Sequence, residues 1–444
     1  MRNWNLLMYS LFIILISSCI KVEEYNPFLN YPTYSKNDLG LSYTPQKSTF
    51  KVYAPDADAV YMNFYEDGVI EESYLVDQMT QGDSSVWETT IKGDLLGKFY
   101  TFQTFRGHGW LKEVPDPYAK AVGVNGLRAM VVDLSKTNPE GWENDQRPPL
   151  ANPNDIILYE LHVRDLTIHS GSAFKNRGKF LGLTESGVTN SQGLSAGLDH
   201  IKELGVTHVH LLPSYDFLSL DESKPEDNKY NWGYDPQNYN VPEGSYSTNP
   251  FDGNVRIREF KKMVQTFHEN GIRVILDVVY NHTGSSMESN FYALVPGYYY
   301  RLNDNGSLSN ASGCGNETAS ERPMMRKFII ESVKYWAEEY HLDGFRFDLM
   351  GIHDIETMNE ISAELHKIDP SIFIYGEGWT AGPSPLAENR RAVKKNTKEL
   401  KNIAVFSDDM RDAVKGHVFT PDAKAFISGL DSLEESVKFG IVAA

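Results

Sequence analysis

The feature that most constrains the fold is an alternation of short apolar segments with helical segments after residue 154. Near-continuous apolar strands separated by helices are typical of a parallel sheet buried on both faces. Six such units between residues 155 and 444 predict an α/β fold, a (β/α)8 TIM-type barrel with insertions. A doubly wound open sheet is the alternative. The expected strands are Ile156–Leu161, Thr207–Leu212, Arg273–Val279, Gly344–Asp348, Ile372–Tyr375 and Ile403–Phe406.

The clearest helix is expected from Pro323 to Tyr340. Pro323 would lie in its first turn, and Ser320 is available as the N-cap. Its apolar residues recur at helical spacing and should pack into the core. They are Met325, Phe328, Ile329, Val333, Trp336, Ala337 and Tyr340.

A different pattern precedes residue 135. Short strands rich in aromatic and β-branched residues, bounded by turns, predict a small β-sandwich over residues 41–135. A proline- and glycine-containing connector would occupy 136–154, and the barrel 155–444. The expected sandwich strands are Phe50–Tyr53, Val60–Phe64, Val86–Ile91 and Lys98–Phe102.

The composition excludes several classes of protein. A hydrophobic fraction of 41% with 23% charged residues is that of a folded chain with a large core, not of a disordered, collagen-like or polytopic membrane protein. The 42 basic and 60 acidic residues give a net charge of 42 − 60 = −18. An acidic chain is a poor nucleic-acid binder, since phosphates need a basic face. A neutral polymer or a small neutral or cationic ligand fits better.

The N-terminus has the pattern of an export signal, predicted over residues 1–18. Arg2 is followed by the apolar stretch Leu6–Ile16 and then by small residues. The sequence around Cys19 resembles the lipobox of bacterial lipoproteins, which implies a diacylated Cys19, a lipid-anchored linker over 19–40 and a membrane partner. The expected location is the cell envelope, at the outer membrane or cell surface. An ordinary signal peptide is the alternative.

Acidic residues stand at the ends of three expected strands. Asp277, Asp348 and Glu377 would meet at the C-terminal edge of the barrel, where active sites of this fold lie. Arg346 and His282 belong to the same segments. Because buried charges are costly, several of them at one edge indicate a polar pocket. We expect the histidines His208 and His210 of the second strand to be core or rim residues and not metal ligands.

Two carboxylates across a ligand suit a retaining glycosidase, which needs a nucleophile and a proton donor about 5–5.5 Å apart. Asp348 and Glu377 could face each other in this way. Arg346 lies two residues before Asp348 and would keep it ionised. Glu377, beside an anion, should have a raised pKa that suits an acid.

These segments resemble three signature regions of the α-amylase superfamily (glycoside hydrolase family 13). The resemblance implies that Asp348 is the nucleophile and Glu377 the general acid/base. It implies that Arg346 hydrogen-bonds the nucleophile, that Asp277 supports the site and that His282 contacts the −1 sugar.

The segment Tyr230–Pro236 is similar to the signature of type I pullulanases, the α-1,6-debranching members of that superfamily. Tyr234 then corresponds to the aromatic under the −1 ring, and Trp232 either binds substrate or packs in its loop. Asn281 is expected at the substrate site, where it either holds local backbone or takes part in a calcium site, as in some relatives. No other cofactor or metal is expected.

Two further stretches, Asp116–Val122 and Val131–Leu134, resemble the pullulanase linker between a sandwich of the carbohydrate-binding module 48 type and the barrel. The family's fourth region, which carries a His-Asp pair with the third carboxylate, is not found. Only 444 − 406 = 38 residues follow Phe406, and one βα unit takes about 30. We therefore expect the front portion of a longer enzyme, with an unpaired sheet edge and exposed apolar surface.

The expected function is retaining hydrolysis of α-1,6 branch links in pullulan, starch or glycogen fragments by a lipid-anchored exported enzyme. The alternatives are an isoamylase-like, branching or α-1,4-acting amylase of the same superfamily, and a non-catalytic surface lipoprotein that binds α-glucan.

Overall fold

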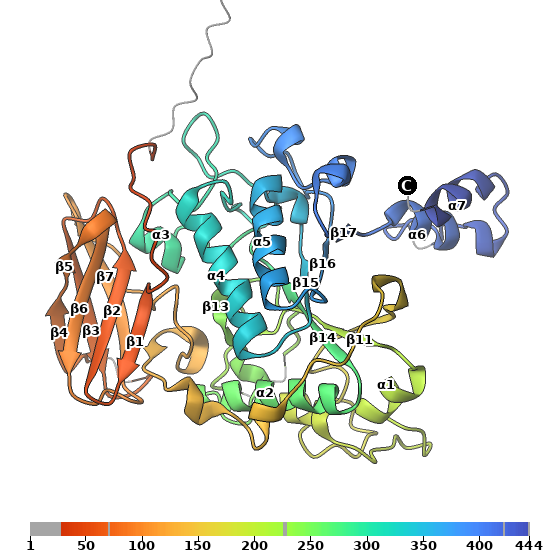
Figure 1. Cartoon of the computed structure of the whole chain (residues 1–444), viewed down its shortest axis with the longest axis horizontal. Coiled ribbons are helices and arrows are strands. Elements are labelled where there is room, and N and C mark those ends of the chain that lie inside the picture. Colours follow the sequence, from red (N-terminus) through yellow and green to blue (C-terminus); the bar gives the residue numbers. More distant parts are fainter. Residues whose placement is uncertain (1–27, 70–71, 225–228, 421, 443–444) are drawn as a thin grey trace, which may run out of the picture. The chain divides into compact units, whose positions relative to one another are not determined.

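The computed structural model describes residues 28–69, 72–224, 229–420 and 422–442 (Figure 1). It divides into two units, which we treat separately: the first contributes the turn at 28–31, and the second begins at Pro32. The predicted signal peptide and Cys19 lie outside the described residues. Within the described part of the chain, no helix combines the length and hydropathy needed to cross a bilayer.

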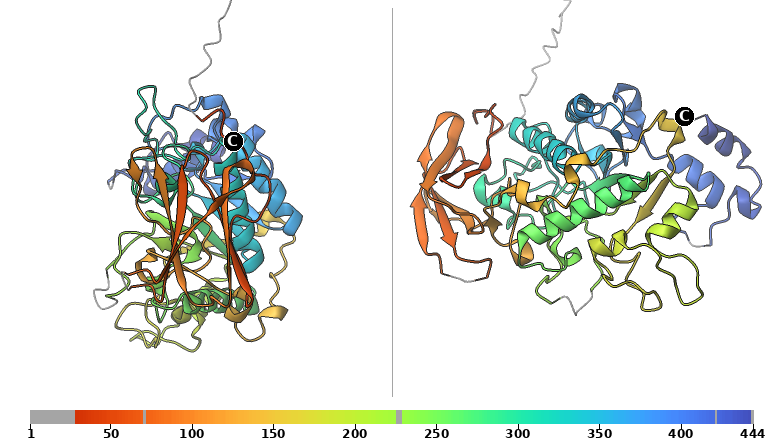
Figure 2. Two further views of the ribbon diagram at one scale, coloured as in Figure 1. Left: turned by 90° about the vertical axis from the view of Figure 1, so that its left-hand side faces the viewer. Right: turned by 60° about the horizontal axis from the view of Figure 1, so that its bottom comes forward.

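The second unit begins with two antiparallel sheets (Figures 1 and 2). Their strand orders are β1-β2-β6-β5 and β4-β3-β7-β8, with β9 also on β7. Alternate residues of β2 point inward, and the Phe50 ring meets those of Phe64 and Tyr100 at 5.5 and 4.8 Å. The sandwich is thus confirmed, with its four expected strands. The strands are β1 Gly40–Thr44, β2 Lys47–Tyr53, β3 Ala59–Tyr65, β4 Leu75–Gln78, β5 Thr80–Gln81, β6 Val86–Lys92, β7 Phe99–Arg106, β8 Gly109–Trp110 and β9 Ala129–Met130.

A six-stranded parallel sheet follows, in the order β10-β11-β14-β15-β16-β17. Each strand pairs with the next one along the sheet, as in a barrel, and the order never reverses as it does in a doubly wound sheet. Among the described residues the sheet does not close, so it forms part of a barrel. Its strands are β10 Leu158–Leu161, β11 His208–Leu211, β14 Arg273–Val278, β15 Gly344–Phe347, β16 Phe373–Gly376 and β17 Ala404–Val405.

Helices accompany this sheet, and α4 and α5 lie side by side (Figure 1). The predicted apolar stripe of α4 is buried as expected. The predicted cap is wrong: the N-cap is Arg322, because the Ser320 hydroxyl is buried and donates to Asp354 Oδ2 at 2.6 Å instead. The helices are α1 Leu198–Leu204, α2 Gly253–Glu269, α3 Asn290–Leu294, α4 Pro323–Glu339, α5 Ile355–Ile368, α6 Asp408–Lys415 and α7 Glu434–Ile441.

The residues after β17 form little core. Phe419, Ile427 and Ile441 are strongly exposed although they are apolar, and α6 packs mainly against α7. This agrees with the expected apolar surface beside an unpaired sheet edge.

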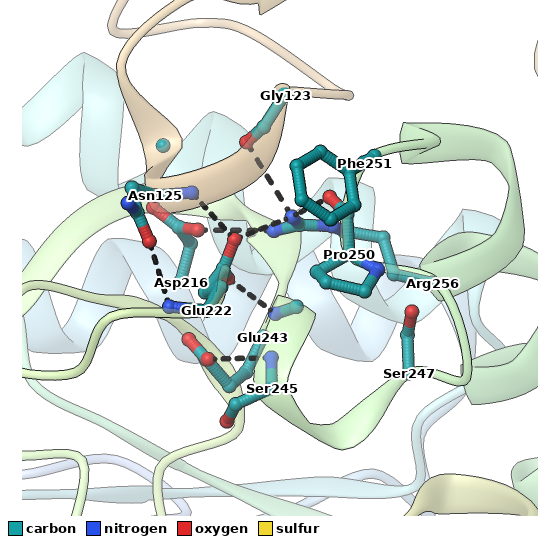
Figure 3. A network of polar contacts seen from close by, with 12 residues as sticks. Gly123, Asn125, Asp216, Glu222, Glu243, Ser245, Ser247, Pro250, Phe251 and Arg256 are labelled. Carbon is teal, nitrogen blue, oxygen red and sulfur yellow. Dashed lines mark hydrogen bonds and ion pairs between the residues drawn. The ribbon is translucent and has the colours of Figure 1, made fainter. Parts of the chain in front are cut away.

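A buried arginine anchors the loop that carries Tyr234. That loop joins the antiparallel strands β12 Tyr215–Phe217 and β13 Pro236–Pro242. Arg256 of α2 donates to Asp216 Oδ1 at 3.0 Å and to Glu222 Oε2 at 2.9 Å (Figure 3). The Asn125 backbone N–H donates to the same Glu222 oxygen at 2.6 Å. One guanidinium therefore ties α2, the hairpin and the segment that leaves the sandwich into one arrangement.

A second buried network fastens the connector to the barrel. His268 Nδ1 lies 2.9 Å from Asp145 Oδ2, and its Nε2 lies 2.8 Å from Asp343 Oδ2. Burial alone would lower the pKa of His268, but the two carboxylates raise it to about 9. The imidazolium thus bridges residues that precede β10 and β15.

This bridge predicts a loss of stability in mild alkali. The folded pKa of His268 exceeds the unfolded value of 6.5, so its contribution is complete below about pH 6 and disappears as the pH rises through 9. The difference corresponds to about 3 kcal/mol. Urea unfolding between pH 6 and 10 should reveal this loss, and His268→Gln should flatten it.

His200→Gln on α1 serves as the matched control and should keep the slope of the parent protein. An unchanged pH dependence in His268→Gln would contradict the bridge.

Candidate active site

The parallel register brings the expected acids to one edge. Asp277 of β14 pairs with Arg346 of β15, and Arg346 pairs with Tyr375 of β16. The ladder continues past the strands, since the Asp348 N–H donates to Val278 O and the Glu377 N–H donates to Phe347 O. Asp348 and Glu377 therefore leave neighbouring strands at the C-terminal end of the sheet, as the sequence predicted.

Arg346 is the centre of the site. Its Nη1 donates to Asp277 Oδ1 at 2.9 Å and to Asp348 Oδ1 at 2.8 Å, and its Nη2 lies 2.7 Å from Glu377 Oε1. Because one planar guanidinium contacts all three carboxylates, Asp348 and Glu377 lie on the same side of the sheet and next to each other.

The backbone adds a second hold on Glu377. Leu349 has φ 39° and ψ 47°, in the left-handed region that costs a non-glycine residue free energy. In this conformation its N–H donates to Glu377 Oε2 at 3.0 Å. Strain beside Asp348 thus accompanies the fixed position of Glu377.

Asp277 is held by two further donors. Tyr234 Oη donates to its Oδ2 at 2.7 Å, and His210 Nε2 lies 3.3 Å from the same oxygen. His210 Nδ1 in turn lies 3.0 Å from Tyr375 Oη. Sequence reasoning placed His210 in the core or rim and missed this contact. A histidine near the end of a strand that precedes an acidic strand end is a weak signal for it.

The charges differ from expectation. We expected Arg346 to keep Asp348 ionised, but burial, then the charge of Asp277, raise the pKa of Asp348 to about 7 despite the arginine. The arginine is shared among three carboxylates. Burial would also raise the pKa of Asp277, yet Arg346 and His210 hold it below its ordinary value. Asp277 is therefore the carboxylate that the site keeps ionised. The raised pKa expected for Glu377 stays a prediction.

Asn281 and His282 extend the site from the end of β14. Asn281 Nδ2 donates to Asp348 Oδ2 at 2.8 Å and to Asp348 O at 2.9 Å. His282 lies between two oxygen acceptors, Asn281 Oδ1 at 2.6 Å and Tyr234 O at 2.9 Å. An imidazolium could donate to both, but burial lowers the pKa of His282. The structure thus brings together seven of the eight residues expected in the site.

The eighth, Trp232, lies at the rim. It is 61% exposed and meets the Tyr230 ring edge-on at 6.5 Å. No contact between Trp232 and the carboxylates is found among the described residues. Its large exposed face remains available for a ligand.

Two places in the structure gather oxygen atoms of the kind that bind cations. Asp216, Glu222 and Glu243 bring carboxylate oxygens within 4.8 Å of one another. Each of their six oxygens already accepts a hydrogen bond from an N–H, several of them from Arg256 or backbone (Figure 3). This donor set fits a guanidinium and not a metal ion.

The alternative role of Asn281 in a calcium site finds no support in the surrounding donor atoms. The Asn281 side-chain oxygen contacts His282, and its amide is bonded to Asp348. Calcium takes about 6–8 oxygen ligands. The side chains that the structure describes around Asn281 do not offer such a set.

Paired carboxylates at the C-terminal edge of parallel barrel strands are the arrangement that retaining glycosidases use. Residues 177–294 match the model of the α-amylase catalytic domain, and residues 38–119 match carbohydrate-binding module 48, the isoamylase N-terminal domain.

Several of the similar proteins are pullulanases. The pullulanase of Bacillus subtilis is 42% identical over 92% of this chain, and the chloroplastic pullulanase 1 of Arabidopsis thaliana is 33% identical over 88%. The crystal structure of the Paenibacillus barengoltzii pullulanase, 51% identical, superposes on 93% of the chain with a TM-score of 0.91. The chain therefore resembles the α-amylase superfamily over the matched residues and is similar to pullulanases over part of their length.

The match is partial. The chain spans 55% of the B. subtilis protein, 45% of the Arabidopsis protein and 64% of the P. barengoltzii chain.

The shared guanidinium predicts a large cost for removing it. Arg346→Met leaves buried Asp277 and Asp348 without their cation, which should lower the free energy of unfolding by about 3–5 kcal/mol. Adding Asp277→Asn should recover part of that loss. Chemical denaturation followed by tryptophan fluorescence measures both variants.

Arg411→Met is the matched control, because Arg411 pairs with Asp412 on the surface at 2.7 Å. It should cost about 0–1 kcal/mol. Equal losses of unfolding free energy in the two arginine variants would show that the buried ion pairs of Arg346 stabilise the fold no more than a surface pair does.

Proposed function

We propose that the protein hydrolyses α-1,6-glucosidic links of pullulan- or starch-type α-glucans with retention of configuration. The observation that carries this proposal is the placement of Asp348 and Glu377 on one guanidinium at the edge of the sheet. Two carboxyls so close together leave no room for a water molecule to attack from the opposite face, as inversion requires.

In the first step an ionised Asp348 attacks the anomeric carbon while Glu377 donates its proton to the glycosidic oxygen, which leaves with the other part of the glucan. In the second step Glu377 takes a proton from water, and that water displaces Asp348 from the sugar. Each residue ends in the state in which it began.

The electrostatics suit this division of labour. Asp277, Asp348 and Glu377 face one cation, and burial, then the charge of Asp277, raise the pKa of Asp348 to about 7, so the site holds a proton readily. A proton on Glu377 removes one negative charge beside Asp348 and so favours the Asp348 anion. One proton shared by two carboxyls gives the acid and the nucleophile together.

The substrate class is supported by what similar proteins bind. The P. barengoltzii pullulanase was crystallised with maltohexaose and α-cyclodextrin, and its mutants with maltotriose and maltotetraose. In this chain, the half-buried Tyr234 ring and the exposed Trp232 offer flat apolar faces on which pyranose rings can lie.

The proposal is tested by measuring pullulan hydrolysis with the protein purified from the cells that naturally produce it. Asp348→Asn and Glu377→Gln should each lower the release of reducing sugar at least about a thousand-fold, since each removes a reacting group. Sizing the products from pullulan and from amylose should show cleavage of pullulan to maltotriose.

Asp304→Asn and Glu143→Gln, both at exposed positions, should leave the rate unchanged. Near-normal hydrolysis by either active-site variant, or cleavage of amylose in preference to pullulan, would overturn the proposal.

We further propose that Cys19 is lipidated and holds the protein at the cell envelope. The support is the sequence alone: the basic start, the apolar stretch and the small residues before Cys19. Because the chain is acidic, we do not propose nucleic acid as a partner.

Lipidation predicts fatty-acid labelling that depends on one cysteine. Cells given radiolabelled palmitate should label the protein, and Cys19→Ser should lose both the label and the membrane association. Cys314→Ser, the other cysteine of the chain, is the control and should keep both. Label retained by Cys19→Ser would contradict the anchor.

A further inference from the structure

A second pocket lies beside the loop that carries Tyr234, and none of the site residues described above lines it. Its volume is about 310 Å³, far more than one water molecule needs. Its walls come from the segment after β10, between Arg164 and Lys179, from the β12–β13 hairpin and from the turn Gly244–Tyr246. The mechanism proposed above uses none of these side chains.

Two cations reach this pocket without a carboxylate partner. Arg177 Nη2 donates to Ser172 O at 2.8 Å, and Lys179 Nζ donates to Ser245 O at 2.7 Å. Within the described part of the chain, neither side chain forms an ion pair. Their acceptors are neutral carbonyl oxygens, which orient the two cations and leave their charge uncompensated. In a chain of net charge −18, two such cations at one pocket indicate a site for an anion.

Two other cations at the wall are already paired with carboxylates. Arg164 Nη1 lies 2.5 Å from Asp165 Oδ1, and Lys224 Nζ lies 2.8 Å from Asp221 Oδ2. These pairs lie near the surface, where solvent screens them. The argument for an anion therefore depends on Arg177 alone with its neighbour Lys179.

A hydroxyl group completes the set of donors. Ser245 borders the pocket, and its Oγ is buried and has no hydrogen-bond partner among the described residues. The Ser245 N–H donates to Glu243 Oε1 at 2.8 Å, while its carbonyl oxygen holds Lys179. A buried hydroxyl without an acceptor costs free energy, and an anion oxygen would supply that acceptor.

The segment that carries the two cations is fixed by its own backbone. Glu185 accepts hydrogen bonds from the Lys175 and Asn176 N–H groups at 2.9 and 2.7 Å, and Thr167 Oγ1 accepts one from the Gly178 N–H at 2.8 Å. Gly178 has φ 69°, and a Cβ there would meet a neighbouring side chain at 3.0 Å. Glycine permits this close approach. Because the donors are held before a ligand arrives, binding costs less entropy.

The rest of the lining is partly apolar. Ile168, Phe217 and Leu220 also border the pocket. A bare inorganic ion would leave this surface uncovered, whereas the carbon skeleton of a sugar phosphate would cover it. Phosphate oxygens in turn accept charge-assisted hydrogen bonds from guanidinium and ammonium groups.

We propose that this pocket binds the phosphate of a sugar phosphomonoester, with Arg177, Lys179 and Ser245 as its donors. Two sources carry that chemistry: a phosphate ester on a glucan chain, and a free sugar phosphate.

The first source would couple the pocket to the active site. Asn231 borders the pocket, and the loop to which it belongs carries Trp232 and Tyr234. A phosphorylated glucan held here would therefore lie beside the catalytic edge. This source rests on the proposed function, whereas the phosphate site does not.

Isothermal titration calorimetry of the full chain at low ionic strength tests the site, with inorganic phosphate and glucose 6-phosphate as probes. Both should bind, and glucose 6-phosphate should bind more tightly because its ring covers the apolar lining. Arg177→Gln removes a charged donor and should weaken both at least about ten-fold. Ser245→Ala removes a neutral donor and should weaken both about three-fold.

Arg390→Gln is the matched control, because Arg390 is exposed and does not line the pocket. It should leave the binding of both probes unchanged. All three variants should bind neutral maltotriose as the parent chain does. Thermal unfolding of each variant without ligand verifies that the fold is intact.

Maltotriose that carries one 6-phosphate separates the two sources, in a chain with Asp348→Asn so that no sugar is hydrolysed. Tighter binding than that of neutral maltotriose, lost on adding Arg177→Gln, assigns the phosphate to a glucan chain. Equal binding of the two maltotrioses, with glucose 6-phosphate still bound, assigns it to a free sugar phosphate.

The site would be overturned if neither inorganic phosphate nor glucose 6-phosphate bound the parent chain, or if Arg177→Gln and Ser245→Ala both left their binding intact. This outcome is distinct from a failure of the proposed function, since calorimetry with these probes reads anion binding and the pullulan assay reads hydrolysis. Loss of hydrolysis with intact phosphate binding would overturn only the function.

Discussion

The structure of the site depends on one buried arginine that faces more negative charge than it can neutralise. Arg346 contacts Asp277, Asp348 and Glu377. A charge so placed is tolerated only where the surrounding fold fixes every partner. The strands supply that fixation, because their register sets Arg346 between Asp277 and Tyr375. The arrangement of the three carboxylates is thus a consequence of sheet register together with the local electrostatics.

Much of the fold could be predicted, because the sheet is buried on both faces and its strands are apolar almost throughout. The six strands and the α4 stripe follow from hydrophobic pattern, which depends on local sequence. The N-cap of α4 could not be predicted in this way, because the Ser320 hydroxyl donates a hydrogen bond to Asp354, the N-cap residue of α5. No local pattern reports such a partner. The Arg256 network that holds the Tyr234 loop is equally hidden, since its members come from α2, the hairpin and the sandwich exit (Figure 3).

The sequence predicted which residues form the candidate site, but it did not predict the pKa of Asp348. The positions of Asp348 and Glu377 follow from strand ends, which the sequence reveals. The raised pKa of Asp348 follows from how deeply it is buried and from how many carboxylates share Arg346, which are properties of the assembled structure. His210 entered the site for the same reason: its contact with Asp277 crosses from β11 to β14.

Leu349 contributes to this site through its backbone, so substitutions of its side chain would not reveal that contribution. The group that tethers Glu377 is the peptide N–H of Leu349, and every amino acid except proline carries that group. Alanine scanning would therefore score position 349 as unimportant while the tether remained intact. Glycine would adopt the left-handed backbone conformation without strain and would keep the hydrogen bond to Glu377. Position 349 can therefore hold different residue types as long as its backbone conformation is kept.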